Sequence, residues 1–143
     1  MKFRHVIPIV FIHGIAAALL TSGCGNDYEQ PTQAPSVDLT GTYQLVSIIF
    51  GAPPALEPPV AVGSLVLTSS DYDLQITLSV TVSGIPDTIT DRGTYTASGN
   101  TWTQVSSLTP TQSTGTFSQQ GDTLSVSVTI GGLKIDSVWR KTG

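Results

Sequence analysis

The sequence is poor in the residues that most enzymes and metalloproteins use. Its 143 residues include one cysteine, two histidines and one methionine, and only 11% are Asp, Glu, Lys or Arg. A single cysteine excludes an intrachain disulfide framework and every zinc site built from paired cysteines. Six Lys and Arg against ten Asp and Glu also argue against nucleic-acid binding, which needs a dense basic surface. The length suits one domain.

The first 23 residues have the layout of a secretory signal peptide. Lys2, Arg4 and His5 form a short positive head, and the stretch from Val6 to Leu20 contains no Asp, Glu, Lys or Arg. A membrane-spanning helix needs about 20 apolar residues, so this stretch is short for a permanent span. It matches the apolar region of a cleaved signal instead.

The residues Thr21-Ser22-Gly23-Cys24 resemble the lipobox of bacterial lipoproteins. The resemblance implies cleavage before Cys24, a diacylglycerol thioether on its sulfur and an acyl chain such as palmitate on its new amine. Several acyl chains anchor a protein stably, whereas one chain binds a membrane only marginally. Gly25 implies, by analogy with enterobacterial sorting, an outer-membrane location facing the periplasm or the cell surface. The alternative is a plain secretory signal followed by an unrelated free cysteine.

Cleavage would remove both histidines and would leave four basic against ten acidic residues. With no histidine and an acylated Cys24, the mature chain lacks the Ser-His and Cys-His nucleophile pairs and the ligands of His-bound metals. We therefore expect no enzymatic activity, catalytic residue, metal or cofactor. Residues 24–38 carry several Pro, Gln and acidic side chains without an aliphatic cluster, which predicts a flexible tether.

From residue 39 to residue 143 the sequence predicts a β domain. Tyr72–Val82 alternates apolar and polar residues with a strict period of two, which is typical of a half-buried strand. Short loops rich in Gly, Asn and Asp join antiparallel neighbours. Eight such strands with one apolar face predict an all-β, antiparallel up-and-down barrel, which also removes exposed edges. The other strands are expected at 41–50, 64–68, 88–97, 101–106, 115–119, 124–130 and 133–141.

Three tight turns predict the register of neighbouring strands, because burial of one face allows only one alignment. Each turn is expected to have two residues and to bring large side chains together on the buried face. The expected pairs are Leu124–Trp139 across Gly131-Gly132, Tyr95–Gln104 across Gly99-Asn100, and Phe117–Leu124 across Gln120-Gly121.

Several short motifs resemble small bacterial lipocalin-like domains. Gly41-Thr42-Tyr43 is similar to the Gly-x-Trp that opens the lipocalin barrel, with Tyr in place of Trp. Gly93-Thr94-Tyr95, Gly115-Thr116-Phe117 and the closing Val138-Trp139-Arg140-Lys141 extend the likeness over most of the mature chain. The chain is short for a lipocalin and has no helix pattern after its last strand. The resemblance implies a barrel that binds a small hydrophobic or amphipathic ligand.

The barrel interior is the candidate ligand site, since eight strands enclose either a side-chain core or one small ligand. The candidate ligand-binding residues are Tyr95, Trp102, Gln104, Phe117 and Trp139, which combine aromatic surface with a polar handle. The alternative is that the aromatic side chains only fill the core. The protein would then be a structural or protein-interaction module of the cell envelope. A space below about 100 Å³ would contradict ligand carriage, since ligand pockets measure about 300–1,000 Å³.

Five aspartates of the domain are expected in or beside turns, with their carboxylates exposed to solvent. Asp71 and Asp73 flank an inward Tyr72, and weak Ca²⁺ binding is the alternative for this pair. Asp87, Asp91 and Asp122 are interpreted in the same way.

Two further features concern the barrel ends. Residues 51–62 are apolar and contain four prolines, so they form a stiff loop that either covers the mouth or plugs it. Arg140 is expected to lie over Tyr43 in a cation–π contact at the other end.

Overall fold

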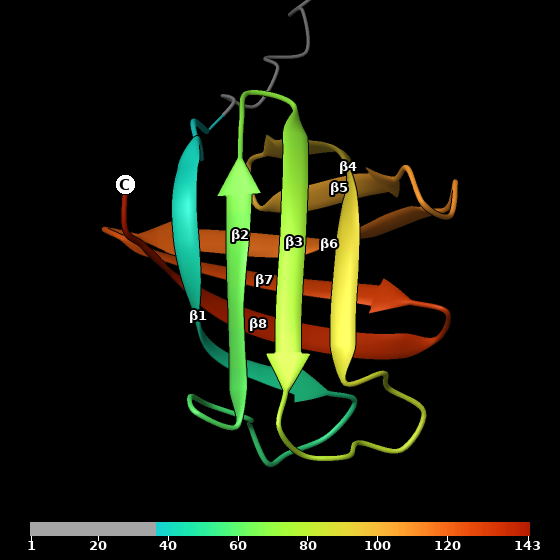
Figure 1. Cartoon of the computed structure of the whole chain (residues 1–143). Helices are drawn as coiled ribbons and strands as arrows, with labels where there is room; N and C mark the ends of the chain where they lie inside the picture. Colours follow the sequence, from blue (N-terminus) through green and yellow to red (C-terminus); the bar gives the residue numbers. More distant parts are fainter. Residues whose placement is uncertain (1–36) are drawn as a thin grey trace, which may run out of the picture. The chain divides into compact units, whose positions relative to one another are not determined.

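The computed structural model describes residues 37–143; the signal segment, Cys24 and residues 24–36 of the tether lie outside the described residues. Eight antiparallel strands pair in chain order, and the last closes onto the first, so the sheet forms a closed barrel as predicted (Figure 1). No helix in the described part is long and apolar enough to cross a membrane. The strands are β1 (Gly41–Phe50), β2 (Ala61–Leu67), β3 (Asp71–Leu78), β4 (Thr88–Ser98), β5 (Thr101–Ser106), β6 (Gln112–Gln120), β7 (Thr123–Ile130) and β8 (Leu133–Lys141).

The strand β3 ends four residues earlier than its alternating pattern predicts. Leu78 pairs with Ala61, the first residue of β2, so no neighbouring strand is left to pair with the residues that follow. The chain turns away there, and the Val80 side chain is 40% exposed. The expected strand Tyr72–Val82 is therefore wrong at its C-terminal end.

Two of the three expected turns have the predicted register. Leu124 pairs with Trp139 and Tyr95 pairs with Gln104. The third register is wrong, because Phe117 pairs with Val126. All three loops begin with a glycine of positive φ, and the third loop is therefore Gly121-Asp122 rather than Gln120-Gly121.

The three Gly-Thr-aromatic triplets share a structural role. Each places its aromatic residue on the inner face of the barrel, where Tyr43, Tyr95 and Phe117 are buried. In the second and third triplets a Cβ atom on the glycine would clash with a carbonyl oxygen of a neighbouring strand. Glycine lets β5 and β7 approach there, as expected where a barrel bends sharply.

One end of the barrel, here called the tight end, is closed around Leu39, Tyr43, Leu67 and Tyr95, all of them buried. The Tyr43 hydroxyl donates to the Leu39 carbonyl at 2.7 Å. The prediction that Arg140 lies over Tyr43 is wrong. The Lys141 ammonium lies there instead, 6.0 Å from the centre of the Tyr43 ring. Strand alternation explains the difference, because Lys141 shares the face of Trp139 whereas Arg140 points outward and is exposed.

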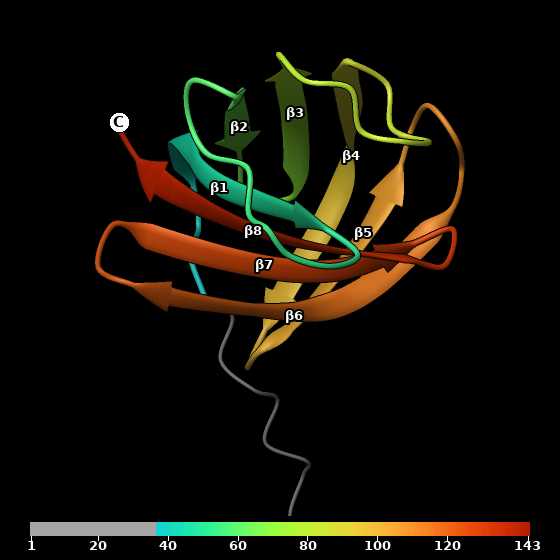
Figure 2. The ribbon, with the colours of Figure 1, turned by 90° about the horizontal axis from the view of Figure 1, so that it is seen from below.

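The opposite end, here called the open end, carries the connections 51–60 and 79–87, which lie together at the bottom of Figure 1. Figure 2 views the ring of strands from this side. The first connection is attached to β1, since Ile48 and Leu56 exchange two backbone hydrogen bonds of 2.9 and 2.8 Å. Apart from Leu56 and Val60, which are half-buried, residues 51–60 are exposed, so this loop does not fill the barrel mouth.

Candidate functional site

The barrel interior contains a cavity of about 110 Å³. Most of its wall is aliphatic and comes from opposite sides of the barrel, with Ile48 on β1, Ile76 on β3 and Val128 on β7. Phe50, Ile89 and Ile130 line it toward the open end and are only half-buried or exposed. The cavity is therefore an apolar space that faces solvent at one end of the barrel.

Three of the five residues expected to bind ligand line this cavity: Trp102, Gln104 and Trp139. The two indole rings are 2% and 3% exposed, so they form part of a packed wall. The Trp102 Nε1 donates to the Gln104 Oε1 at 2.8 Å. The Trp139 Nε1 donates to the Ser137 Oγ at 2.9 Å.

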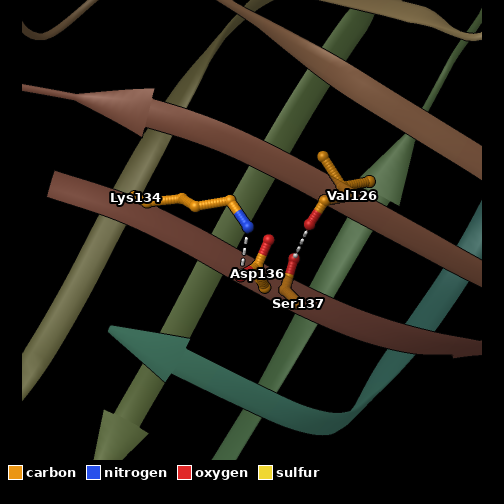
Figure 3. Close-up of polar contacts among 4 residues, drawn as sticks. All are labelled: Val126, Lys134, Asp136 and Ser137. Atoms are coloured by element: carbon orange, nitrogen blue, oxygen red, sulfur yellow. Dashed lines mark hydrogen bonds and ion pairs between the residues drawn. The ribbon is translucent and has the colours of Figure 1, made fainter. Parts of the chain in front are cut away.

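Ser137 links this wall to the neighbouring strand. Its hydroxyl donates to the Val126 carbonyl at 3.3 Å, as Figure 3 shows. On the same strand, Lys134 and Asp136 alternate with the inward residues and form an exposed ion pair of 2.8 Å (Figure 3). The Lys134 hydrogen bond holds the pKa of the Asp136 carboxyl below its usual value.

The other two expected residues, Tyr95 and Phe117, are buried but do not line the cavity. Tyr95 stacks on Trp102 with ring centres 4.7 Å apart, and Phe117 meets the same indole edge-on at 6.4 Å. The Tyr95 hydroxyl donates to the Thr68 carbonyl at 2.8 Å, and burial raises its pKa to about 12. These two rings therefore pack against Trp102 and do not face the cavity.

Asp91 is a site residue that the sequence interpretation missed. It was expected near a turn with its carboxylate in solvent, but its half-buried side chain lines the cavity from within β4. Its carboxylate accepts hydrogen bonds from the Tyr72 hydroxyl at 2.7 Å, the Ser106 hydroxyl at 2.5 Å and the Arg92 backbone at 2.9 Å. Burial and the bond to Asp91 raise the pKa of Tyr72. Every second residue of a strand lies on the same face, so counting back from the inward Tyr95 could have identified Asp91 as an inward residue.

A groove of about 350 Å³ lies at the open end of the barrel. One wall is Phe50, Ala52, Pro54 and Leu56, and the other is residues 80–83. Phe50 borders both spaces, so the groove and the cavity have this residue in common. The proline-rich connection therefore forms a wall at the mouth of the barrel.

The remaining acidic side chains offer little chemistry. Asp71 and Asp73 are exposed, and Asp71 accepts from the Ser70 hydroxyl at 2.9 Å within its own turn. Within residues 37–143, no group of three or more His, Cys, Asp or Glu is arranged to hold a metal ion.

The comparisons with known proteins identify no family. No protein-family model matches the chain, and no curated protein is significantly similar to it. An uncharacterized protein from Bacteroides eggerthii is 11% identical, covering 73% of this chain and 100% of its own, with a TM-score of 0.46. A mutant of the fluorescent protein UnaG is 12% identical over 73% of this chain and 96% of its own, with a TM-score of 0.39.

Proposed function

We propose that this protein is a membrane-anchored, lipocalin-like lipoprotein that binds a small amphipathic molecule at the open end of its barrel. The observation that carries the proposal is that one residue, Phe50, lines both an interior cavity and a surface groove. Apolar walls with a few polar groups are typical of small-molecule sites. No catalytic step is part of the proposal.

The size of the cavity limits how a ligand binds. At about 110 Å³ it is smaller than the roughly 150 Å³ that accommodates benzene in an engineered core. It is also smaller than a complete drug-sized site of about 300–1,000 Å³. We therefore propose that one end of the ligand enters the cavity and that the rest lies in the groove of about 350 Å³.

The membrane attachment is proposed from the sequence. Acyl chains on Cys24 would hold the protein to the membrane of the cell envelope, with residues 24–38 as a tether. The outer membrane, facing the periplasm or the cell surface, is the proposed location. We expect Cys24→Ser to move the protein from the membrane fraction to the soluble fraction of its host. Unchanged membrane fractionation of this variant would contradict lipid anchoring.

A second candidate function is a protein-interaction module with a filled barrel. The burial of both tryptophans and the small size of the cavity favour it, since buried aromatic rings commonly serve as packing. This candidate predicts that no small amphiphile enters the barrel.

Tryptophan fluorescence distinguishes the two candidates. The chain has two tryptophans, and both line the cavity, so a bromine-tagged aliphatic alcohol bound there should quench their emission saturably. The titration uses the chain carrying Cys24→Ser, which cannot carry a thioether-linked lipid at this position. Val128→Phe, which fills the cavity, should abolish saturable quenching. The matched control Val105→Phe, at a position 38% exposed on β5, should retain it. Absence of saturable quenching in the parent chain would contradict ligand binding.

A further inference from the structure

The cavity has an uneven charge distribution. Among the described residues that line it, Asp91 is the single charged side chain, and no Lys, Arg or His is present. The basic residues of the barrel lie elsewhere: Arg92, Lys134 and Arg140 are exposed, and Lys141 lies beside Tyr43 at the tight end. An anionic group that entered the cavity would therefore meet a carboxylate and no cation.

The carboxylate of Asp91 is held in place and still has room for a partner. The Tyr72 hydroxyl donates to Oδ2, while the Ser106 hydroxyl and the Arg92 N–H donate to Oδ1. A carboxylate offers roughly four acceptor positions, so about one remains for a ligand. Gln104, whose Oε1 accepts from Trp102, adds N–H donors to the same cavity wall.

We propose, on the basis of the ligand binding proposed above, that the cavity selects amphiphiles whose head group is not anionic and donates hydrogen bonds. A primary amine or an alcohol provides an N–H or O–H donor for Asp91. A carboxylate has no donor, and its charge repels that of Asp91 within an otherwise apolar cavity. The occupant is thus a long-chain amine or alcohol rather than a fatty acid.

Calorimetric titrations with decylamine, decanol and decanoate, which differ only in the head group, test this selectivity. In the chain carrying Cys24→Ser, we expect the amine and the alcohol to bind at least about tenfold more tightly than the carboxylate. Asp91→Asn should bring the three affinities close together. Asp73→Asn is the matched control, since it removes the same charge from an exposed position, and it should leave the order unchanged.

Each outcome is decisive. If none of the three probes binds, the proposed ligand-binding function fails. If decanoate binds as tightly as decylamine and decanol, binding stands and the selectivity is wrong. If Asp73→Asn weakens amine binding as much as Asp91→Asn does, the preference comes from the overall negative charge and not from Asp91. Should Asp91→Asn fail to fold, Gln104→Glu provides the second variant: it must widen the preference for the amine, and an unchanged preference would overturn the assignment.

Discussion

The tight end and the open end of the barrel use their aromatic residues differently. At the tight end the Tyr43 side chain is 0% exposed and its hydroxyl is bonded to the Leu39 carbonyl. At the open end Phe50 is half-buried and borders two spaces that protein atoms do not fill. Packing stabilises the first end, whereas the second leaves apolar surface available to a ligand.

The chain ends add to this contrast. Thr42 donates to the Gly143 carbonyl at 3.0 Å and accepts from the Thr142 N–H at 2.8 Å, which ties the C-terminal residues to the start of β1. The connections 51–60 and 79–87 at the open end are longer than the turns of the tight end and are largely exposed. A closed barrel can therefore keep one end incompletely packed, because the hydrogen-bonded ring and the other end maintain the fold.

The largest expected effect comes from truncating an aromatic side chain at each end. Tyr43→Ala should destabilise the protein by about 3–5 kcal/mol, because it removes a fully buried ring. Phe50→Ala should cost about 1–2 kcal/mol, because that ring is only half-buried. Urea unfolding followed by circular dichroism measures both values. Equal losses for the two variants would contradict the difference between the ends.

Much of this fold could be predicted from the sequence because the decisive signals are local. Strict alternation from Tyr72 to Leu78 determines which face is buried, and glycines with positive φ determine the turns. The end of β3 could not be predicted in this way, since it depends on where β2 begins. The alternation within β3 does not indicate where its neighbouring strand begins.

The candidate site was predicted less completely than the fold. Alternation indicates the face of a residue but not its depth along the barrel, so Tyr95 and Phe117 were grouped with Trp102 although they lie behind it. Asp91 was missed because an acidic side chain usually faces water. Its half-buried carboxylate depends on two hydroxyl donors, Tyr72 on β3 and Ser106 on β5, which only the folded barrel brings close.

Alkaline pH is expected to lower the stability of the protein by an intermediate amount, through Tyr95 at the tight end. Burial raises the pKa of Tyr95 from 10.0 to about 12, so the neutral phenol contributes stability below pH 10 that is lost as the pH rises toward 12. Tyr95→Phe loses the hydrogen bond to Thr68 and should be less stable than the parent by about 1 kcal/mol at neutral pH. This deficit should shrink above pH 10. Chemical denaturation at several pH values tests it, and a constant deficit would argue against a raised pKa.

The smallest change in stability is expected from a substitution on the outer face of the barrel. Lys134 and Asp136 form an exposed ion pair, so Lys134→Ala should change the free energy of unfolding by less than about 0.5 kcal/mol. The same urea titrations measure it. A loss comparable to that of Phe50→Ala would indicate that the outer face of β8 contributes more to stability than the open end.

The central claim is that a ligand binds at the open end and leaves the tight end unchanged. Methyl NMR spectra recorded during a titration with decanol test this claim directly. We predict saturable shifts for Ile89, Ile130 and Ile135, which line the cavity, and none for Leu39 and Leu67, which are buried at the tight end. Shifts confined to the exposed outer valines Val66 and Val105, or no shifts at all, would contradict it.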